Sequence, residues 1–151
     1  MSLSRLTIRE ARRADLEAIV ALLAEDFLGA GREDAAPEAY AAAFAAIEAS
    51  PDNRLFAAEA DGAVIGCFQL TLIPNISLGG GTRAQIEGVR TAGPWRGRGV
   101  GAAMMRFAIA EARAAGCVLV QLTTNAERKR ARAFYQRLGF VASHDGMKLA
   151  L

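Results

Sequence analysis

The sequence contains few of the residues that build disulfide frameworks, metal sites or thiol-based catalytic centres. Its 151 residues include two cysteines and one histidine, His144. A disulfide framework needs more cysteines at regular spacing, so Cys67 and Cys117, which each lie in an apolar run, are expected to be buried free thiols in a reducing compartment. Neither cysteine has a histidine nearby, which argues against paired thiol catalysis, and we expect no metal site.

Long apolar runs and a strong charge of one sign are also absent. No apolar stretch approaches the roughly 20 residues that cross a bilayer, and the N-terminus has no apolar signal core. The net charge of +2 is too small to indicate nucleic-acid binding. With 52% apolar and 23% charged residues the composition is globular, so we expect a single cytoplasmic domain over residues 1–151, without nucleic-acid or membrane partners.

Arginine supplies nearly all of the positive charge. Only Lys129 and Lys148 among the 18 basic residues are lysine. Arginine binds phosphate through a planar fork of donors, so its clusters matter more than the total charge. One cluster is Arg96 with Arg98. The other is the basic run Arg128–Arg132, whose short extent favours a solvated helix face over a nucleic-acid patch.

The spacing of apolar residues alternates between strand and helix patterns. Asp61-Gly62 predicts a hairpin turn, and Gly88 inside a strand pattern predicts a bulge or a close backbone approach. The predicted strands are Leu6–Glu10, Arg54–Ala60, Ala63–Ile73, Thr82–Thr91 and Cys117–Thr123, with a closing hairpin of Phe140–Ala142 and Met147–Leu151. The predicted helices are Asp15–Phe27, Pro37–Ser50, the segment after Gly101 to about Ala115, and Glu127–Leu138. This order indicates a mixed α/β fold with helices layered on a sheet.

The glycine-rich loop Pro94–Gly101 lies between a predicted strand and a predicted helix. Unpaired N–H groups and the positive end of the dipole make such a helix start an anion site. Glycines at three alternate positions of this loop let a diphosphate approach the backbone, and Arg96 and Arg98 add positive charge. The loop lacks the Gly-Lys-Ser/Thr of a Walker A motif, and its glycine spacing and late position do not fit a dinucleotide fingerprint.

The pattern Arg96-x-x-Gly99-x-Gly101 resembles the phosphate-binding motif of the GNAT superfamily of N-acetyltransferases. The strand Ile86–Thr91 before it and the run Ala131-x-x-Phe134-Tyr135-x-x-Leu138-Gly139-Phe140 after it resemble the same family. The resemblance is specific over Ile86–Phe140 and holds elsewhere by element order only. It implies the GNAT fold: a central, mostly antiparallel twisted sheet with splayed parallel strands four and five, flanked by about four helices.

The resemblance implies that acetyl-CoA is the co-substrate and that one stretch of chain binds it. The backbone groups of Val89 and Thr91 are expected to pair with the pantetheine arm, Arg90 between them to belong to the cofactor site, and Phe134 to lie near the arm. The pyrophosphate is expected at Arg96, Gly97, Arg98, Gly99, Val100, Gly101 and Ala102. Relatives commonly carry an asparagine seven residues before the tyrosine of the last run. Arg128 stands there in this chain, so either Arg128 or Asn125 is expected to contact the cofactor, and the basic run is a candidate for its 3′-phosphate.

The resemblance also implies two catalytic residues. Glu87 would accept the proton of the attacking amine, directly or through water, and Tyr135 would protonate the departing thiolate. A backbone N–H of the bulged strand near Gly88 would stabilise the oxyanion. The alternatives are that Glu87 points only to solvent and that Tyr135 packs in the core.

The acceptor is expected to be a small-molecule primary amine, with a protein N-terminus or lysine as the second choice. A non-catalytic acyl-CoA-binding regulatory module is the alternative from another class. Asp26, Glu33 and Asp34 lie in the region expected to bind the acceptor and suit a cationic amine, whereas Arg83 suits an anionic group. His144, by the predicted closing turn, is expected to be a surface residue, with a place in that pocket as the alternative. A homodimer is possible by analogy with relatives.

Overall fold

The computed structural model describes residues 5–25 and 31–151. The chain divides into two compact units, Met1–Gln121 and Leu122–Leu151, which are described in turn. Among the described helices, none combines the length and the apolar character that a membrane span requires. That both units belong to one domain, as the composition suggests, stays a prediction.

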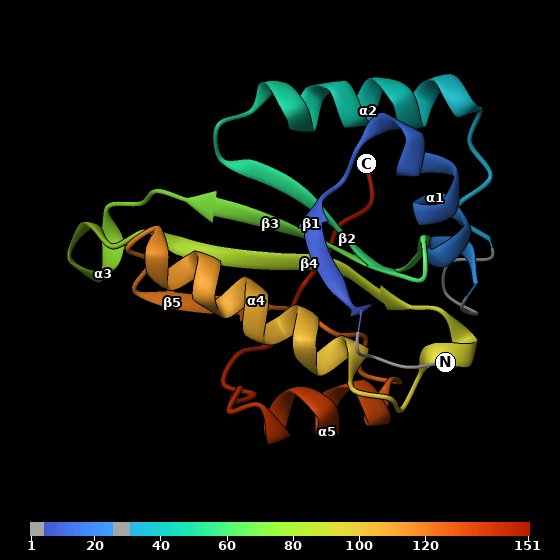
Figure 1. Ribbon diagram of the computed structural model, residues 1–151. Helices are drawn as coiled ribbons and strands as arrows, with labels where there is room; N and C mark the ends of the chain where they lie inside the picture. Colours follow the sequence, from blue (N-terminus) through green and yellow to red (C-terminus); the bar gives the residue numbers. More distant parts are fainter. Residues whose placement is uncertain (1–4, 26–30) are drawn as a thin grey trace. The chain divides into compact units, whose positions relative to one another are not determined.

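A five-stranded sheet forms the centre of the first unit (Figure 1). Its strands lie side by side in chain order: β1 (Thr7–Glu10), β2 (Asn53–Ala60), β3 (Ala63–Ile73), β4 (Arg83–Thr91) and β5 (Leu119–Leu122). The first four pair antiparallel, and β5 runs parallel to β4. The predicted mixed, mostly antiparallel sheet is thus confirmed.

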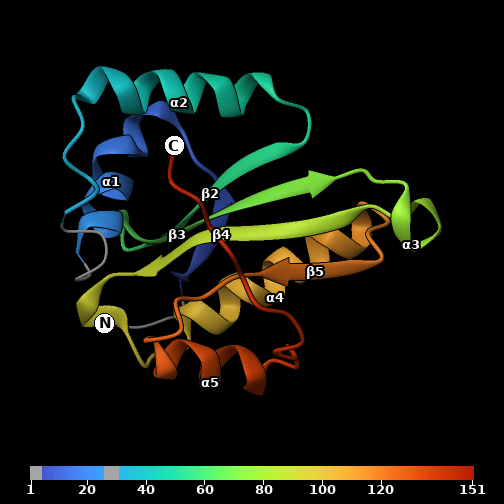
Figure 2. The ribbon, with the colours of Figure 1, turned by 180° about the vertical axis from the view of Figure 1, so that it is seen from behind.

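Helices cover both faces of this sheet (Figure 1, Figure 2). α1 (Leu16–Ala24) and α2 (Pro37–Ala49) lie on one face and α4 (Val100–Ala114) lies on the other. Short turns η2 (Arg13–Asp15), α3 (Ser77–Gly80) and η3 (Gly93–Trp95) connect the longer elements. The largest fully buried side chains are Phe56, Phe68, Ile86, Met104, Met105, Val100 and Cys67. Most of them lie between the sheet and α4, where they anchor the helix that follows the glycine-rich loop.

Two glycine-containing turns set the geometry of the sheet. Asp61 and Gly62 have φ of 50° and 77°, which is the left-handed turn that the hairpin prediction requires. Gly88 has φ of 61°, and the β3–β4 register shifts beside it, from Cys67 opposite Arg90 to Gln69 opposite Glu87. The predicted bulge in β4 is therefore confirmed.

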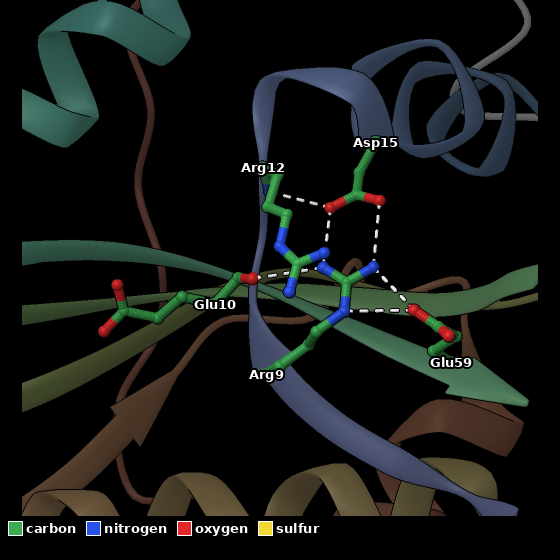
Figure 3. A network of polar contacts seen from close by, with 5 residues as sticks. All are labelled: Arg9, Glu10, Arg12, Asp15 and Glu59. Atoms are coloured by element: carbon green, nitrogen blue, oxygen red, sulfur yellow. Dashed lines mark hydrogen bonds and ion pairs between the residues drawn. The ribbon is translucent and has the colours of Figure 1, made fainter. Parts of the chain in front are cut away.

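A network of ion pairs joins β1, η2 and β2 (Figure 3). The guanidinium of Arg9 donates to both carboxylate oxygens of Asp15, at 2.7 and 3.1 Å, and to Oε2 of Glu59, at 3.0 and 2.6 Å. Asp15 also accepts the N–H of Arg12 at 2.7 Å. Asp15 is the one charged residue buried in the described part of the chain. Its charge is tolerated because all of these donors face it.

The second unit contains α5 (Lys129–Arg137) and the chain that follows it. Gly139 ends the helix with φ of 96°, as predicted. The ring of Tyr135 meets Phe134 and Phe140 edge-on, with centroids 5.1 and 5.8 Å apart. These three rings form a small aromatic cluster at the C-terminal end of α5.

The predicted closing hairpin is wrong, because residues 140–151 form no strand. The N–H of Phe140 donates to the carbonyl oxygen of Tyr135 at 3.1 Å and so completes the end of α5 instead of a strand ladder. This leaves the first arm of the hairpin too short to pair. Met147 and Leu149 are 94% and 87% exposed, so the alternating apolar side chains that suggested a strand do not reach a core.

Candidate functional site

The glycine-rich loop connects β4 to α4 through a sharp turn. The η3 turn follows β4, and Trp95 in it is buried. Gly97 and Gly99 have φ of 73° and 87°, so both positions favour glycine. Gly99 is the residue immediately before the first turn of α4. The loop therefore delivers the chain directly into the start of a 15-residue helix.

The start of α4 presents backbone N–H groups at the end of this loop. The helix ladder begins with the N–H of Ala103, which donates to the carbonyl oxygen of Gly99 at 3.0 Å. The amides of Val100, Gly101 and Ala102 precede that bond, in the turn where an α-helix supplies no backbone acceptor. The helix dipole adds a partial positive charge there. This arrangement suits an anionic ligand such as a diphosphate.

Two arginine side chains frame the loop. Arg96 is 55% exposed, and its Nε donates to the carbonyl oxygen of Thr91 at 3.1 Å. The guanidinium carbon of Arg98 lies 5.9 Å from the ring centroid of Trp95. Both side chains add positive charge to the surface of the loop, as the sequence predicts.

The last part of β4 extends past β5. The N–H of Val118, just before β5, donates to the carbonyl oxygen of Thr82 at 2.9 Å. The side-chain Nε2 of Gln121 donates to Oε1 of Gln85 at 2.7 Å. β5 ends at Leu122, whereas β4 continues to Thr91. β5 therefore lies beside the first part of β4, and the last part of β4 continues beyond the end of β5. The expected splay of the two parallel strands stays a prediction.

One hydrogen bond shows which way the backbone groups of β4 point in the part of the strand that continues beyond β5. The N–H of Ala92 donates to the carbonyl oxygen of Ile65 in β3 at 2.8 Å. Because backbone groups alternate in direction along a strand, those of Thr91 point to the opposite edge. That edge is the one next to β5, where an extended ligand can add to the sheet as a strand does.

Glu87 lies on β4 directly before the bulge at Gly88. It is exposed and lies opposite Gln69 of β3. Within the described part of the chain its carboxylate makes no hydrogen bond or ion pair, so it is open to a ligand or to water. The first unit thus brings together Glu87, the free edge of β4 and the glycine-rich loop.

Both cysteines are free, as the sequence predicts. Cys67 lies in β3, opposite Arg90 of β4. It is buried, and burial raises the pKa of its thiol to about 12, although nearby Arg90 opposes the shift. Its Sγ lies 3.5 Å from the carbonyl oxygen of Gly88. A thiol with that pKa is not a nucleophile near neutral pH. Cys117 is half-buried rather than buried, and burial raises its pKa as well.

The other predicted site residues belong to the second unit. Phe134 and Tyr135 are half-buried in the aromatic cluster of α5. The side chain of Asn125 accepts the N–H of Glu127 at 2.9 Å, and its carbonyl oxygen accepts the N–H of Arg128 at the same distance. These bonds shape the turn that starts α5. These residues belong to the second unit, whereas Glu87 belongs to the first.

Sequence reasoning missed one residue at the loop and named others in the acceptor region. Glu25, directly after α1, accepts the N–H of Gly93 at 2.9 Å. The nearby candidate Asp26 lies outside the described residues. Glu33 accepts a hydrogen bond from the hydroxyl of Tyr40 at 3.2 Å. No local pattern pointed to Glu25, because its contact spans 68 positions of the chain.

Comparison with known families agrees with this geometry. Residues 16–140 match the family model described as the acetyltransferase (GNAT) family. The match covers most of the chain, including β4, the loop, α4 and α5. The chain therefore belongs to the acetyltransferase (GNAT) family. It is an N-acetyltransferase, in line with its curated relatives.

Individual relatives match over nearly the whole chain. A crystal structure described as a transcriptional regulator from Bacillus halodurans has a TM-score of 0.94 and 42% identity, covering 97% of this chain and all of that one. A putative acetyltransferase from Agrobacterium tumefaciens has a TM-score of 0.87 and 30% identity, covering 96% and 99%. The aminoalkylphosphonate N-acetyltransferase of Salmonella typhimurium is 28% identical over 144 residues, which are 95% of this chain and 90% of that protein.

Proposed function

We propose that this protein transfers an acetyl group from acetyl-CoA to the primary amine of a small molecule. The observation that carries the proposal is the free end of β4, which leads directly into an amide-lined helix start. An extended thioester with a diphosphate needs both features in this order. The family to which the chain belongs supports the same donor.

The pantetheine arm and the diphosphate of acetyl-CoA each have a proposed binding partner in the first unit. The outward backbone groups of β4 between Val89 and Thr91 suit the two amides of pantetheine, because they extend a sheet edge. The amides between Gly97 and Ala102 suit the diphosphate, and Arg96 adds charge. Phe134 is proposed to lie near the pantetheine arm. Either Asn125 or Arg128 is proposed to make a further contact with the cofactor.

Glu87 and Tyr135 carry the chemistry in this proposal. An alkylamine with a pKa near 10 arrives protonated, and Glu87 accepts its proton directly or through one water. The nitrogen then attacks the acetyl carbonyl carbon, and a backbone N–H near Gly88 stabilises the oxyanion. When the carbon–sulfur bond breaks, Tyr135 gives its hydroxyl proton to the thiolate and regains one from the nitrogen through solvent.

The surface beside Glu87 favours a polar acceptor. Register places Gln69 opposite Glu87, and Thr71 opposite Gln85, on the same face of the sheet. Asn53 joins this face from β2, where its side-chain oxygen accepts Gln69 at 3.3 Å and Thr71 at 2.6 Å. These neutral donors and acceptors suit a hydrogen-bonding substrate more than an apolar one.

An anionic group on the acceptor has separate support. The relative from Salmonella typhimurium is an aminoalkylphosphonate N-acetyltransferase. In this chain Arg83 begins β4, and its Nε is buried without a hydrogen-bond partner. Aminoalkylphosphonates are therefore the first amines to test, ahead of neutral amines and peptides.

A regulatory role is the second candidate. Its support is the transcriptional-regulator description of the Bacillus halodurans relative, which is 42% identical. A regulator that only binds acyl-CoA has no need of an open carboxylate beside the thioester. Turnover therefore distinguishes the two candidates, whereas cofactor binding does not.

The test is the release of CoA thiol from acetyl-CoA against a panel of amines. We expect turnover with at least one small amine, and a loss of about 10²–10⁴-fold in kcat for both Glu87→Gln and Tyr135→Phe with CoA affinity retained. Glu38→Gln is the matched control, since Glu38 is exposed in the first turn of α2. Absence of turnover with every amine, together with wild-type CoA binding by both variants, favours the regulatory role.

A further inference from the structure

A carboxylate from α1 reaches into the entrance of the glycine-rich loop. Glu25 is the residue after the last turn of α1. Its Oε1 accepts the N–H of Gly93 at 2.9 Å and lies 3.9 Å from Nη2 of Arg96. The side chain is 37% exposed, so it is anchored at the surface of the loop rather than buried in the core.

Glycine at position 93 leaves room for this contact. Gly93 is not among the glycines with positive φ, so its backbone does not require glycine. A Cβ at this position would lie 2.8 Å from Oε1 of Glu25, and no other atom of the described residues is that near. A side chain here would therefore displace the end of the Glu25 side chain from the amide.

α1 contacts β4 at a second glycine. A Cβ on Gly88 would lie 3.7 Å from Cδ2 of Leu23, which belongs to the last turn of α1. Leu23 and Glu25 thus contact the two glycines at either end of the segment Val89–Ala92. This is the segment proposed to pair with pantetheine.

Glu25 also acts on the first residue of the phosphate motif. Nε of Arg96 is held by the carbonyl oxygen of Thr91, and Glu25 attracts its Nη2. These two contacts orient the guanidinium from opposite ends. A carboxylate beside a diphosphate site is unfavourable by charge alone, so a residue with no positioning role would weaken binding there.

We propose that Glu25 is a positioning residue that fixes the entrance of the acetyl-CoA loop to α1 and orients Arg96 toward the diphosphate. The inference rests on the proposed function and adds a residue from outside the family motif. Its consequence is that loss of the Glu25 carboxylate weakens the binding of CoA, although it removes a negative charge.

The test is a cycle of Glu25→Ala, Gly93→Ala and the double variant, with CoA affinity measured from the fluorescence of Trp95. Trp95 is the single tryptophan of the chain and lies in the loop itself. We expect each single variant to bind CoA about tenfold more weakly, as the loss of one hydrogen bond to a charged group implies. The double variant should bind no more weakly than Glu25→Ala, because the added methyl group then has no carboxylate to displace.

Two controls separate positioning from charge and from folding. Glu17→Ala removes the same charge from the exposed first turn of α1 and should leave CoA affinity within about twofold. Glu25→Gln keeps an oxygen for the N–H of Gly93 and should recover part of the affinity. In the acetyltransferase assay Glu25→Ala should raise the KM for acetyl-CoA with kcat and the KM for the amine unchanged.

The outcomes are distinct. A wild-type protein that does not bind CoA overturns the proposed function, and this inference with it. A wild-type protein that binds CoA, with Glu25→Ala binding equally well or better, overturns the inference alone. Additive losses in the cycle also overturn it, because Gly93 then acts independently of the carboxylate.

Discussion

Substituting Asp15 by alanine should destabilise the first unit through the Arg9 network (Figure 3). The change removes two hydrogen bonds from the Arg9 guanidinium and one from the N–H of Arg12. Breaking a buried ion pair typically costs about 3–5 kcal/mol. Arg9 still keeps Glu59, and its side chain is 21% exposed, so we expect about 2–3 kcal/mol here. For a chain of this length the melting temperature should fall by about 5–10 °C.

A matched substitution tests the burial argument. Glu59→Ala removes two hydrogen bonds from the same guanidinium, but the Glu59 side chain is 34% exposed, against 10% for Asp15. Solvent screens the more exposed pair, so we expect a loss of about 1 kcal/mol. Urea denaturation at neutral pH gives both free energies of unfolding. Equal losses for the two variants, or a loss below about 1 kcal/mol for Asp15→Ala, would refute the reasoning.

The contribution of Asp15 to the free energy of unfolding should depend on pH, and the direction of that dependence follows from its pKa. The hydrogen bonds from Arg9, followed by the N–H of Arg12, hold the pKa of the Asp15 carboxyl below its ordinary value of 3.8 against the opposing effect of burial. A carboxyl with a depressed pKa stabilises the folded state fully above its unfolded pKa, and this contribution is lost as the pH falls through the folded pKa. The stability difference between wild type and Asp15→Asn should therefore shrink from about pH 5 downward. A difference that grows on acidification would contradict the assignment.

Two further predictions concern the cysteines and one tight glycine. Cys117 should react with a thiol reagent in the folded protein, whereas Cys67, with a pKa of about 12, should react only on unfolding; equal rates would contradict its burial. Gly81→Ala should cost about 1–3 kcal/mol, because a Cβ would lie 2.6 Å from Cγ1 of Val118. The loss should be partly recovered in Gly81→Ala/Val118→Ala, since the backbone oxygen of Leu78 still lies 3.0 Å from the added Cβ. Gly31→Ala, where no atom of the described residues lies within 4 Å, should be near neutral by thermal denaturation.

Local patterns in the sequence predicted most of the secondary structure. The strand Ala63–Ile73 has the predicted bounds, and the bulge at Gly88 follows from a glycine inside a strand pattern. The loop with positive φ at Gly97 and Gly99 was predictable for the same reason, because spacing and residue type determine it locally.

The features that the sequence did not reveal depend on distant partners. The Arg9–Glu59 contact joins residues 50 positions apart, and the Glu25–Gly93 contact joins residues 68 apart. Periodicity carries no information about either pair. The wrong hairpin has a related cause, since alternation in Met147–Leu151 predicts a strand only if an edge is available to pair with it. The catalytic roles of Glu87 and Tyr135 stay predictions, because sequence periodicity carries no information about where two distant residues lie relative to a shared substrate.

The central claim is that the loop at the start of α4 binds the diphosphate of acetyl-CoA. Gly97→Glu tests it most directly, with Gly116→Glu as the control at the other end of α4. The two glycines have nearly the same φ, 73° and 75°, and a Cβ on either meets no atom of the described residues within 4 Å, so the strain and the added charge are matched. We predict that Gly97→Glu weakens CoA binding by more than about 100-fold, while Gly116→Glu stays within about twofold of wild type. Equal CoA affinities in the two folded variants would contradict the claim.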